Sequence, residues 1–128
     1  MGDVGSMGIA FWIAALVGKL MVATGELKWI LLLTVYGVET VATIVERLRL
    51  KENIFKAHRR HLYQLLVNDK KVPHIRVSIT YAALQLVLSA VLLLSDLPQW
   101  IIIPAIIIPA ITLYLIVKSS IKRQIARR

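Results

Sequence analysis

Apolar residues gather into four long runs, and short polar segments separate them. The runs cover residues 7–23, 29–45, 77–94 and 100–117 and hold 17, 17, 18 and 18 residues. A transmembrane helix needs about 17–25 mostly apolar residues, and at this length only helices satisfy the backbone amides inside lipid. None of the runs carries the polar stripe of a surface helix. The pattern therefore predicts an all-α, polytopic membrane protein with four transmembrane helices in a single unit, residues 1–128.

The polar segments differ in charge, and this difference predicts the orientation. Residues 46–76 carry nine of the 16 Lys and Arg residues, and the tail from residue 118 carries five more. Segments 24–28 and 95–99 together carry one. Because Lys and Arg are enriched in cytoplasmic loops, we expect both termini and the loop 46–76 on the cytoplasmic side of the membrane. This topology explains the net charge of +9. We therefore expect anionic membrane lipids as partners and no nucleic acid.

The loop between the second and third runs gathers the histidines of the chain. His58 and His61 lie three residues apart, so a helix would place them on one face beside Arg59 and Arg60. The loop also has an apolar side, which predicts an amphipathic helix at the membrane interface. That side is formed by Ile54, Phe55, Leu62, Leu65 and Leu66. Glu46 and Arg49 are spaced for an ion pair within a helix.

This basic cluster suits a phosphate or pyrophosphate ligand. Arginine presents forked donors to phosphate oxygens, and imidazole can donate a hydrogen bond or move a proton. A closed zinc site is disfavoured because the chain has no cysteine, and Asp69 and His74 are poorly spaced as further ligands. The alternative is that these side chains are simply solvated charges at the membrane interface.

A second motif, GDVGS, occupies residues 2–6 directly before the first apolar run. Glycines allow close approach of a backbone to a ligand, and the carboxylate of Asp3 could hold Mg²⁺, which in turn binds phosphate. The alternative is that Asp3 only caps a helix start.

In this order, the two motifs resemble the C-terminal part of the polyprenyl-phosphate N-acetylhexosamine-1-phosphate transferases. This is glycosyltransferase family 4, which includes relatives of phospho-N-acetylmuramoyl-pentapeptide transferase and of undecaprenyl-phosphate N-acetylglucosaminyl-1-phosphate transferase. The resemblance covers essentially the whole chain: GDVGS, two spans, the segment NIFKAHRRHLYQ at residues 53–64, then two further spans.

The resemblance implies transfer of a sugar 1-phosphate from a UDP-N-acetylhexosamine to undecaprenyl phosphate, with Mg²⁺ as cofactor and UMP as the second product. It also implies a location in the bacterial plasma (inner) membrane, with the active side cytoplasmic. It implies that Asp3 belongs to the metal and catalytic centre. It also implies that His61 is catalytic and that residues 58–61 bind the substrate, namely His58, Arg59, Arg60 and His61.

The match to the family's histidine motif is partial. Many members read Asp-Arg-x-His-x-His-His where residues 58–64 here read HRRHLYQ. Arg59 and His61 match, whereas His58 replaces an aspartate, and Tyr63 and Gln64 replace histidines. A branch that makes O-antigen and capsule precursors shows a similar pattern. This favours a role in lipopolysaccharide or other surface polysaccharide biosynthesis over peptidoglycan of the cell wall.

The family's aspartate-rich metal motif has no counterpart among the three aspartates, Asp3, Asp69 and Asp96, none of which are adjacent. We therefore expect a fragment of a larger transferase that is inactive alone and needs a missing N-terminal half, or a homodimer, as its partner.

Two charges fall inside apolar runs, Lys19 and Glu39. Intramembrane charges are costly and often functional. Lys19 can extend towards the headgroups. Glu39 supports another interpretation, a small four-span proton-coupled exporter that uses this carboxylate. A non-catalytic membrane partner subunit is a further alternative.

Overall fold

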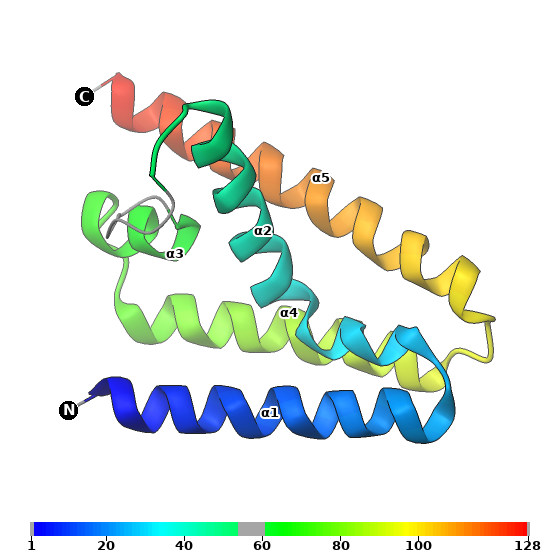
Figure 1. Cartoon of the computed structure of the whole chain (residues 1–128). Coiled ribbons are helices and arrows are strands. Elements are labelled where there is room, and N and C mark those ends of the chain that lie inside the picture. The colour runs from blue at the N-terminus through cyan, green and yellow to red at the C-terminus, as the bar shows by residue number, and fades with distance from the viewer. Residues whose placement is uncertain (1, 54–60, 128) are drawn as a thin grey trace.

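The structure is a computed structural model that describes residues 2–53 and 61–127, with side chains from residue 4 onward. Within these ranges every regular element is a helix (Figure 1). The elements are α1 (Gly2–Thr24), η1 (Leu27–Leu33), α2 (Thr34–Arg49), α3 (Leu62–Gln64), η2 (Leu65–Asp69), α4 (His74–Leu94) and α5 (Gln99–Ala126).

The four predicted spans are confirmed as helices long and apolar enough to cross a membrane. They comprise Val4–Thr24, Leu27–Arg49, His74–Leu94 and Gln99–Ala126. The last helix includes Pro104 and Pro109 without a break. It continues past the predicted end at residue 117 into the basic tail. The first helix begins at Gly2, so the GDVGS motif forms its first turns.

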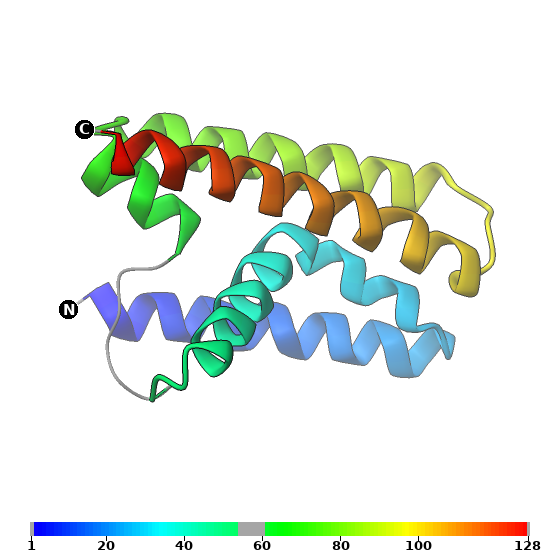
Figure 2. The same ribbon diagram turned by 90° about the horizontal axis from the view of Figure 1, so that it is seen from above.

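The helices run up and down, so the long loop and both ends of the chain lie together. Figures 1 and 2 show the amino end of α1, the segment α3–η2 and the carboxyl end of α5 at one end of the molecule. The short turns between α1 and η1 and between α4 and α5 lie at the opposite end. This is the up-and-down order of helices that the charge pattern predicts. The cytoplasmic location of the loop end stays a prediction.

The second span is broken, whereas the sequence pattern predicts one regular helix. A 3₁₀ helix, η1, gives way to α2 at Leu33, whose φ and ψ are −117° and 19° (Figure 2). Gln85 of α4 satisfies the backbone at this break. Its Oε1 accepts a hydrogen bond from Val35 N at 3.0 Å, and its Nε2 donates to Leu31 O at 3.1 Å. Irregular backbone at membrane depth persists where neighbouring groups satisfy it in this way.

Two small apolar clusters hold the helices together. Leu31, Leu92, Ile102 and Ile106 form one cluster on η1, α4 and α5. Leu62, Tyr114 and Ile121 form the other, at the loop end, and Leu65 and Leu66 pack against it. The apolar side predicted for the loop therefore contacts α5 through these three leucines; Ile54 and Phe55 lie outside the described residues.

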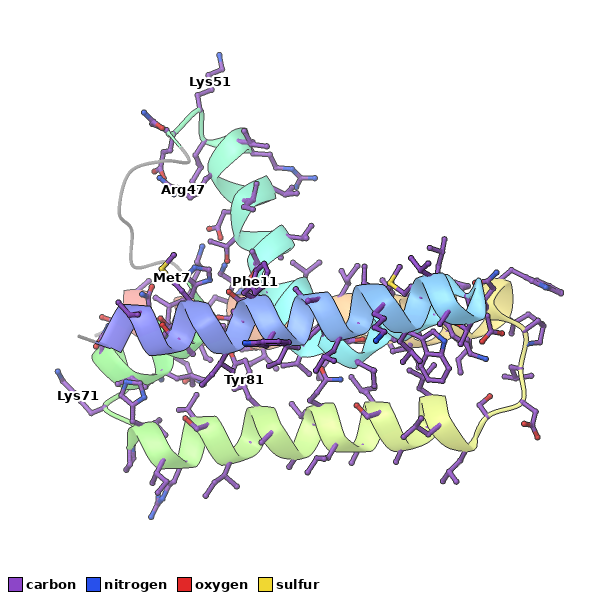
Figure 3. The ribbon with its side chains drawn as sticks, turned by 60° about the horizontal axis from the view of Figure 1, so that its bottom comes forward. Met7, Phe11, Arg47, Lys51, Lys71 and Tyr81 are labelled. Carbon is purple, nitrogen blue, oxygen red and sulfur yellow. The ribbon has the colours of Figure 1, made fainter. Side chains whose placement is uncertain are left out.

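Helix α1 contributes little to either cluster. Its apolar side chains are largely exposed along its length, Met7 by 70% and Phe11 by 71% (Figure 3). Large exposed apolar surfaces of this kind mark contact with lipid or with other protein. The rest of the molecule, η1 to α5, therefore builds the interior that positions the polar site.

Candidate functional site

A buried carboxylate organises the polar residues at the loop end. Glu39 lies on α2 and is only 6% exposed. Its Oε1 accepts a hydrogen bond from the backbone N–H of Tyr63 at 3.1 Å and lies 3.9 Å from Nδ1 of His61. A buried carboxylate needs such partners, because an isolated charge is strongly disfavoured away from water. Glu39 thus joins α2 to the segment that carries the histidine motif.

His61 stands at the start of the short helix α3, with its side chain about one quarter exposed. Its backbone N–H donates to Gln64 Oε1 at 3.3 Å. Its ring stacks on that of Tyr63, with centroids 5.8 Å apart and planes inclined by 22°. Thr43 Oγ1 lies 3.5 Å from Nδ1. The imidazole is therefore oriented from two sides while part of it stays accessible.

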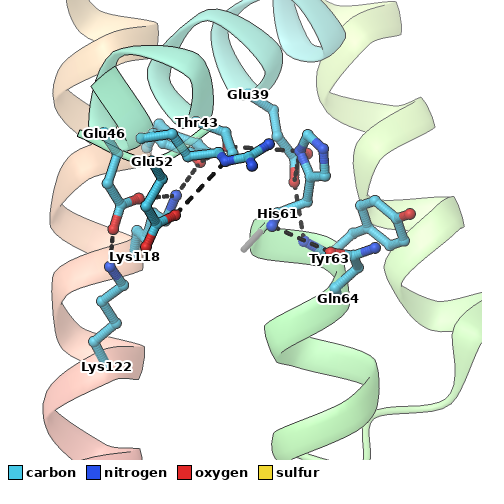
Figure 4. A network of polar contacts seen from close by, with 11 residues as sticks. Glu39, Thr43, Glu46, Glu52, His61, Tyr63, Gln64, Lys118 and Lys122 are labelled. Carbon is cyan, nitrogen blue, oxygen red and sulfur yellow. Dashed lines mark hydrogen bonds and ion pairs between the residues drawn. The ribbon is translucent and has the colours of Figure 1, made fainter. Parts of the chain in front are cut away.

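A second group of polar residues continues from Thr43 across to α5 (Figure 4). Thr43 Oγ1 lies 3.4 Å from the hydroxyl of Tyr114, which accepts a hydrogen bond from Lys118 Nζ at 2.9 Å. Lys118 also forms an ion pair with Glu46 at 2.8 Å, and Lys122 pairs with the same carboxylate. Glu46 thus pairs with two lysines of α5, so the predicted pairing with Arg49 is wrong. Both lysines reach it because α5 lies beside α2.

The same polar group closes one end of a long apolar groove of about 970 Å³ between α2 and α5. Apolar side chains line most of its length, from Ile30 to Leu115. Its loop end is lined by Glu46, Arg49, Lys118 and Lys122. The groove is therefore apolar along most of its length and ends at a cluster with an excess of positive charge.

The predicted site residues differ in how far the structure describes them. His61 is described and lies in the cluster above. Asp3 lies in the first turn of α1, at the same end of the molecule, but its side chain is outside the described residues. His58, Arg59 and Arg60 also lie outside them, between Asn53 and His61. Lys19 is on α1 and exposed, and its extension towards the headgroups stays a prediction.

The Mg²⁺ prediction depends on Asp3. Among the side chains that the structure describes, no group of three or more His, Asp or Glu residues is placed to hold a metal ion. Glu39 and His61 form a pair; of the other described carboxylates nearby, Glu46 is engaged by two lysines and Glu52 by Arg47. Mg²⁺ binding stays a prediction for the GDVGS end of α1.

Three members of the polar cluster, Thr43, Tyr114 and Lys118, were not predicted from the sequence. Spacing carries some signal for them, because Glu39, Thr43 and Glu46 follow at intervals of four and three residues on one helix face. Tyr114, Lys118 and Lys122 repeat every four residues on α5. The sequence does not predict that this face of α2 packs against this face of α5.

No protein-family model, curated protein or solved structure matches the chain significantly.

Proposed function

We propose that this chain is the part of a membrane transferase that moves a sugar 1-phosphate from a UDP-N-acetylhexosamine to undecaprenyl phosphate. The product would start a lipid-linked cell-surface polysaccharide. The observation that carries the proposal is the order of GDVGS and the histidine motif on a four-span chain. The up-and-down fold supports it, because the amino end of α1 lies at the same end of the molecule as α3, which begins directly after His61.

The chemistry requires charge neutralisation near the headgroups. A phosphate oxygen of undecaprenyl phosphate attacks the phosphorus that carries the sugar, the bond from this phosphorus to the bridging oxygen breaks, and UMP leaves. Such phosphoryl transfers depend mainly on positioning and electrostatic stabilisation. Mg²⁺, when bound, would neutralise phosphate charge, and Asp3 would hold it. Arg59, Arg60 and His58 would bind the nucleotide pyrophosphate, and His61 would exchange a proton with the reacting phosphates.

The groove between α2 and α5 suits the lipid substrate. A polyprenyl chain is apolar, as is most of the groove, and the basic loop end suits a phosphate at the membrane surface. Both substrates would then meet at the loop end, the soluble one from the cytoplasm and the lipid one from the bilayer.

An exporter that uses Glu39 is the main alternative from another class. Glu39 lines a cavity of about 510 Å³, so access for protons does not by itself separate the two functions. Here Glu39 accepts the amide hydrogen of Tyr63 and faces His61, so its partners come from a long loop that an exporter does not need. The contacts of Glu39 therefore favour the transferase.

The test is an assay in membranes of the cell that makes this chain. Asp3→Asn and His61→Ala are introduced, and Mg²⁺-dependent transfer from UDP-N-acetylhexosamine into lipid is measured. Each variant should lower the rate by roughly 10²-fold or more, as expected for loss of a metal ligand or an acid–base group. His74→Ala is the matched control, because His74 is an exposed histidine in the first turn of α4 and lies outside the motif. It should change the rate less than about twofold.

Normal transfer in both variants, with the chain present in the membrane at its usual level, would reject the catalytic role. If transfer is lost when the chain is deleted but not when Asp3 or His61 is replaced, the chain is a non-catalytic partner subunit.

A further inference from the structure

Glu39 is buried, titratable and outside both motifs, and it contacts the one motif histidine that the structure describes. We propose that Glu39 is a positioning residue for His61, holding the imidazole with its Nδ1 proton towards α2. The inference rests on the proposed function only for its catalytic consequence. The contact itself can be tested without any enzyme assay.

Two contacts of Glu39 act on the same short segment. Its Oε1 accepts the Tyr63 N–H at 3.1 Å, and this bond anchors the backbone two residues after His61. The same oxygen lies 3.9 Å from His61 Nδ1. One carboxylate therefore fixes both the path of the chain and the direction of the ring. Apolar packing supports this arrangement, because Leu62, between the two contacts, is buried against Tyr114 and Ile121.

The hydrogen bond made by one ring nitrogen determines the protonation of the other. A carboxylate beside Nδ1 favours a proton on that nitrogen, and in the neutral ring Nε2 is then the unprotonated atom. Separations near 4 Å between catalytic partners commonly shorten when substrate binds. The Thr43 hydroxyl, 3.5 Å from Nδ1, can accept the same proton, so both neighbours of this nitrogen on α2 suit its protonated form. The carboxylate thus selects which nitrogen of His61 is turned towards a substrate.

The chain suits a direct spectroscopic test because it has only three histidines. The full chain, labelled with ¹⁵N-histidine, is reconstituted in bilayers of bacterial lipids, and the histidine signals are assigned by His58→Gln and His74→Gln. In the wild type, neutral His61 should be mainly the Nδ1–H tautomer. Glu39→Gln should shift His61 towards the Nε2–H tautomer and leave the signals of His74 unchanged.

Glu46→Gln is the matched control, since Glu46 is a carboxylate on the same helix that pairs with α5 lysines and not with His61. It should leave the His61 signals unchanged. The inference is wrong if Glu39→Gln leaves the His61 tautomer as in the wild type, or if Glu46→Gln shifts it equally.

A measurement on the unmutated chain covers the case in which Glu39→Gln does not fold. With the glutamate side-chain carboxyls labelled with ¹³C, dipolar recoupling to histidine Nδ1 should detect a pair consistent with the 3.9 Å between Oε1 and Nδ1. Absence of dephasing for His61 Nδ1 would overturn the contact.

The catalytic consequence is measured in the membrane assay above. Glu39→Gln should lower kcat about tenfold with little change in KM for the UDP-sugar, the usual range for loss of a group that orients a catalytic residue. Glu39→Asp should recover part of this loss. If His61→Ala removes activity but Glu39→Gln does not, the inference fails and the proposed function stands. If His61→Ala has no effect, the proposed function fails, and the tautomer and distance measurements still decide the contact.

Discussion

At the scale of single residues, the loop end is organised by charges that lie where apolar helices meet. Lys118 is 5% exposed, yet it donates to Tyr114 and pairs with Glu46. Lys122 pairs with the same carboxylate from a half-exposed position. Partners of a buried charge matter more than those of an exposed one, because water cannot replace them. The two lysines should therefore contribute unequally.

Replacing Lys118 tests this difference. Lys118→Met should lower the free energy of unfolding by about 1–3 kcal/mol, because Glu46 and the Tyr114 hydroxyl lose a buried partner. Lys122→Met, the matched control on the same face, should cost less than about 1 kcal/mol. Denaturant titration of the chain in detergent micelles measures both, and equal losses would contradict the account.

Some of these residues stand out in the sequence and others do not. Glu39 and His61 stand out, because a carboxylate in an apolar run and a histidine in a basic loop are both unusual. The sequence does not predict that the two residues meet, nor that Thr43 and Tyr114 lie between Glu39 and Lys118. A single chain shows which residues share a helix face, but not which faces of different helices pack together.

At the scale of elements, the broken second span is the feature that the apolar pattern hides. Residues 29–45 are apolar enough for one helix, and hydropathy does not distinguish a 3₁₀ turn from an α-helical one. The break turns α2 out of the line of η1 (Figure 2), and on α2 Thr43 and Glu46 contact Tyr114 and Lys118 of α5. The position of the site therefore depends on a kink that Gln85 stabilises from another helix.

Gln85→Leu should accordingly be costly. It leaves Val35 N–H without the side-chain oxygen that accepts its hydrogen bond, whereas Leu31 C=O keeps the Thr34 hydroxyl as a donor at 2.6 Å. We expect a loss of about 1–3 kcal/mol, the cost of unsatisfied buried groups. Gln124→Leu on exposed helix surface should cost under about 0.5 kcal/mol, because water replaces its lost partner. Equal thermal stabilities of the two variants in micelles would show that the break does not need Gln85.

At the scale of the whole molecule, the four spans run up and down, so that the long loop and both chain ends lie at one end. Helix number, span positions and the grouping of the loop with both termini were predictable, because apolar length and basic residues carry that information. The sidedness follows from charge alone and is still a prediction.

The lack of native cysteine makes sidedness directly measurable. Single cysteines are introduced as Asn68→Cys and Arg123→Cys at the loop end and as Asp96→Cys in a short turn. All three positions are exposed. In intact spheroplasts a membrane-impermeant thiol reagent should label Asp96→Cys and should reach the other two only after permeabilisation. The reverse labelling would invert the topology and place the histidine loop away from the cytoplasm.

The central claim is that this chain serves a sugar-1-phosphate transfer. The most direct measurement uses UDP-N-acetylhexosamine labelled in both the sugar and the phosphate that carries it. This substrate is added with Mg²⁺ to membranes with the chain, without it, and with it restored. We predict that both labels enter the lipid fraction with release of UMP, and that this transfer disappears and returns with the chain. Transfer that is unchanged without the chain, or a lipid product with the sugar label but not the phosphate, would contradict the claim.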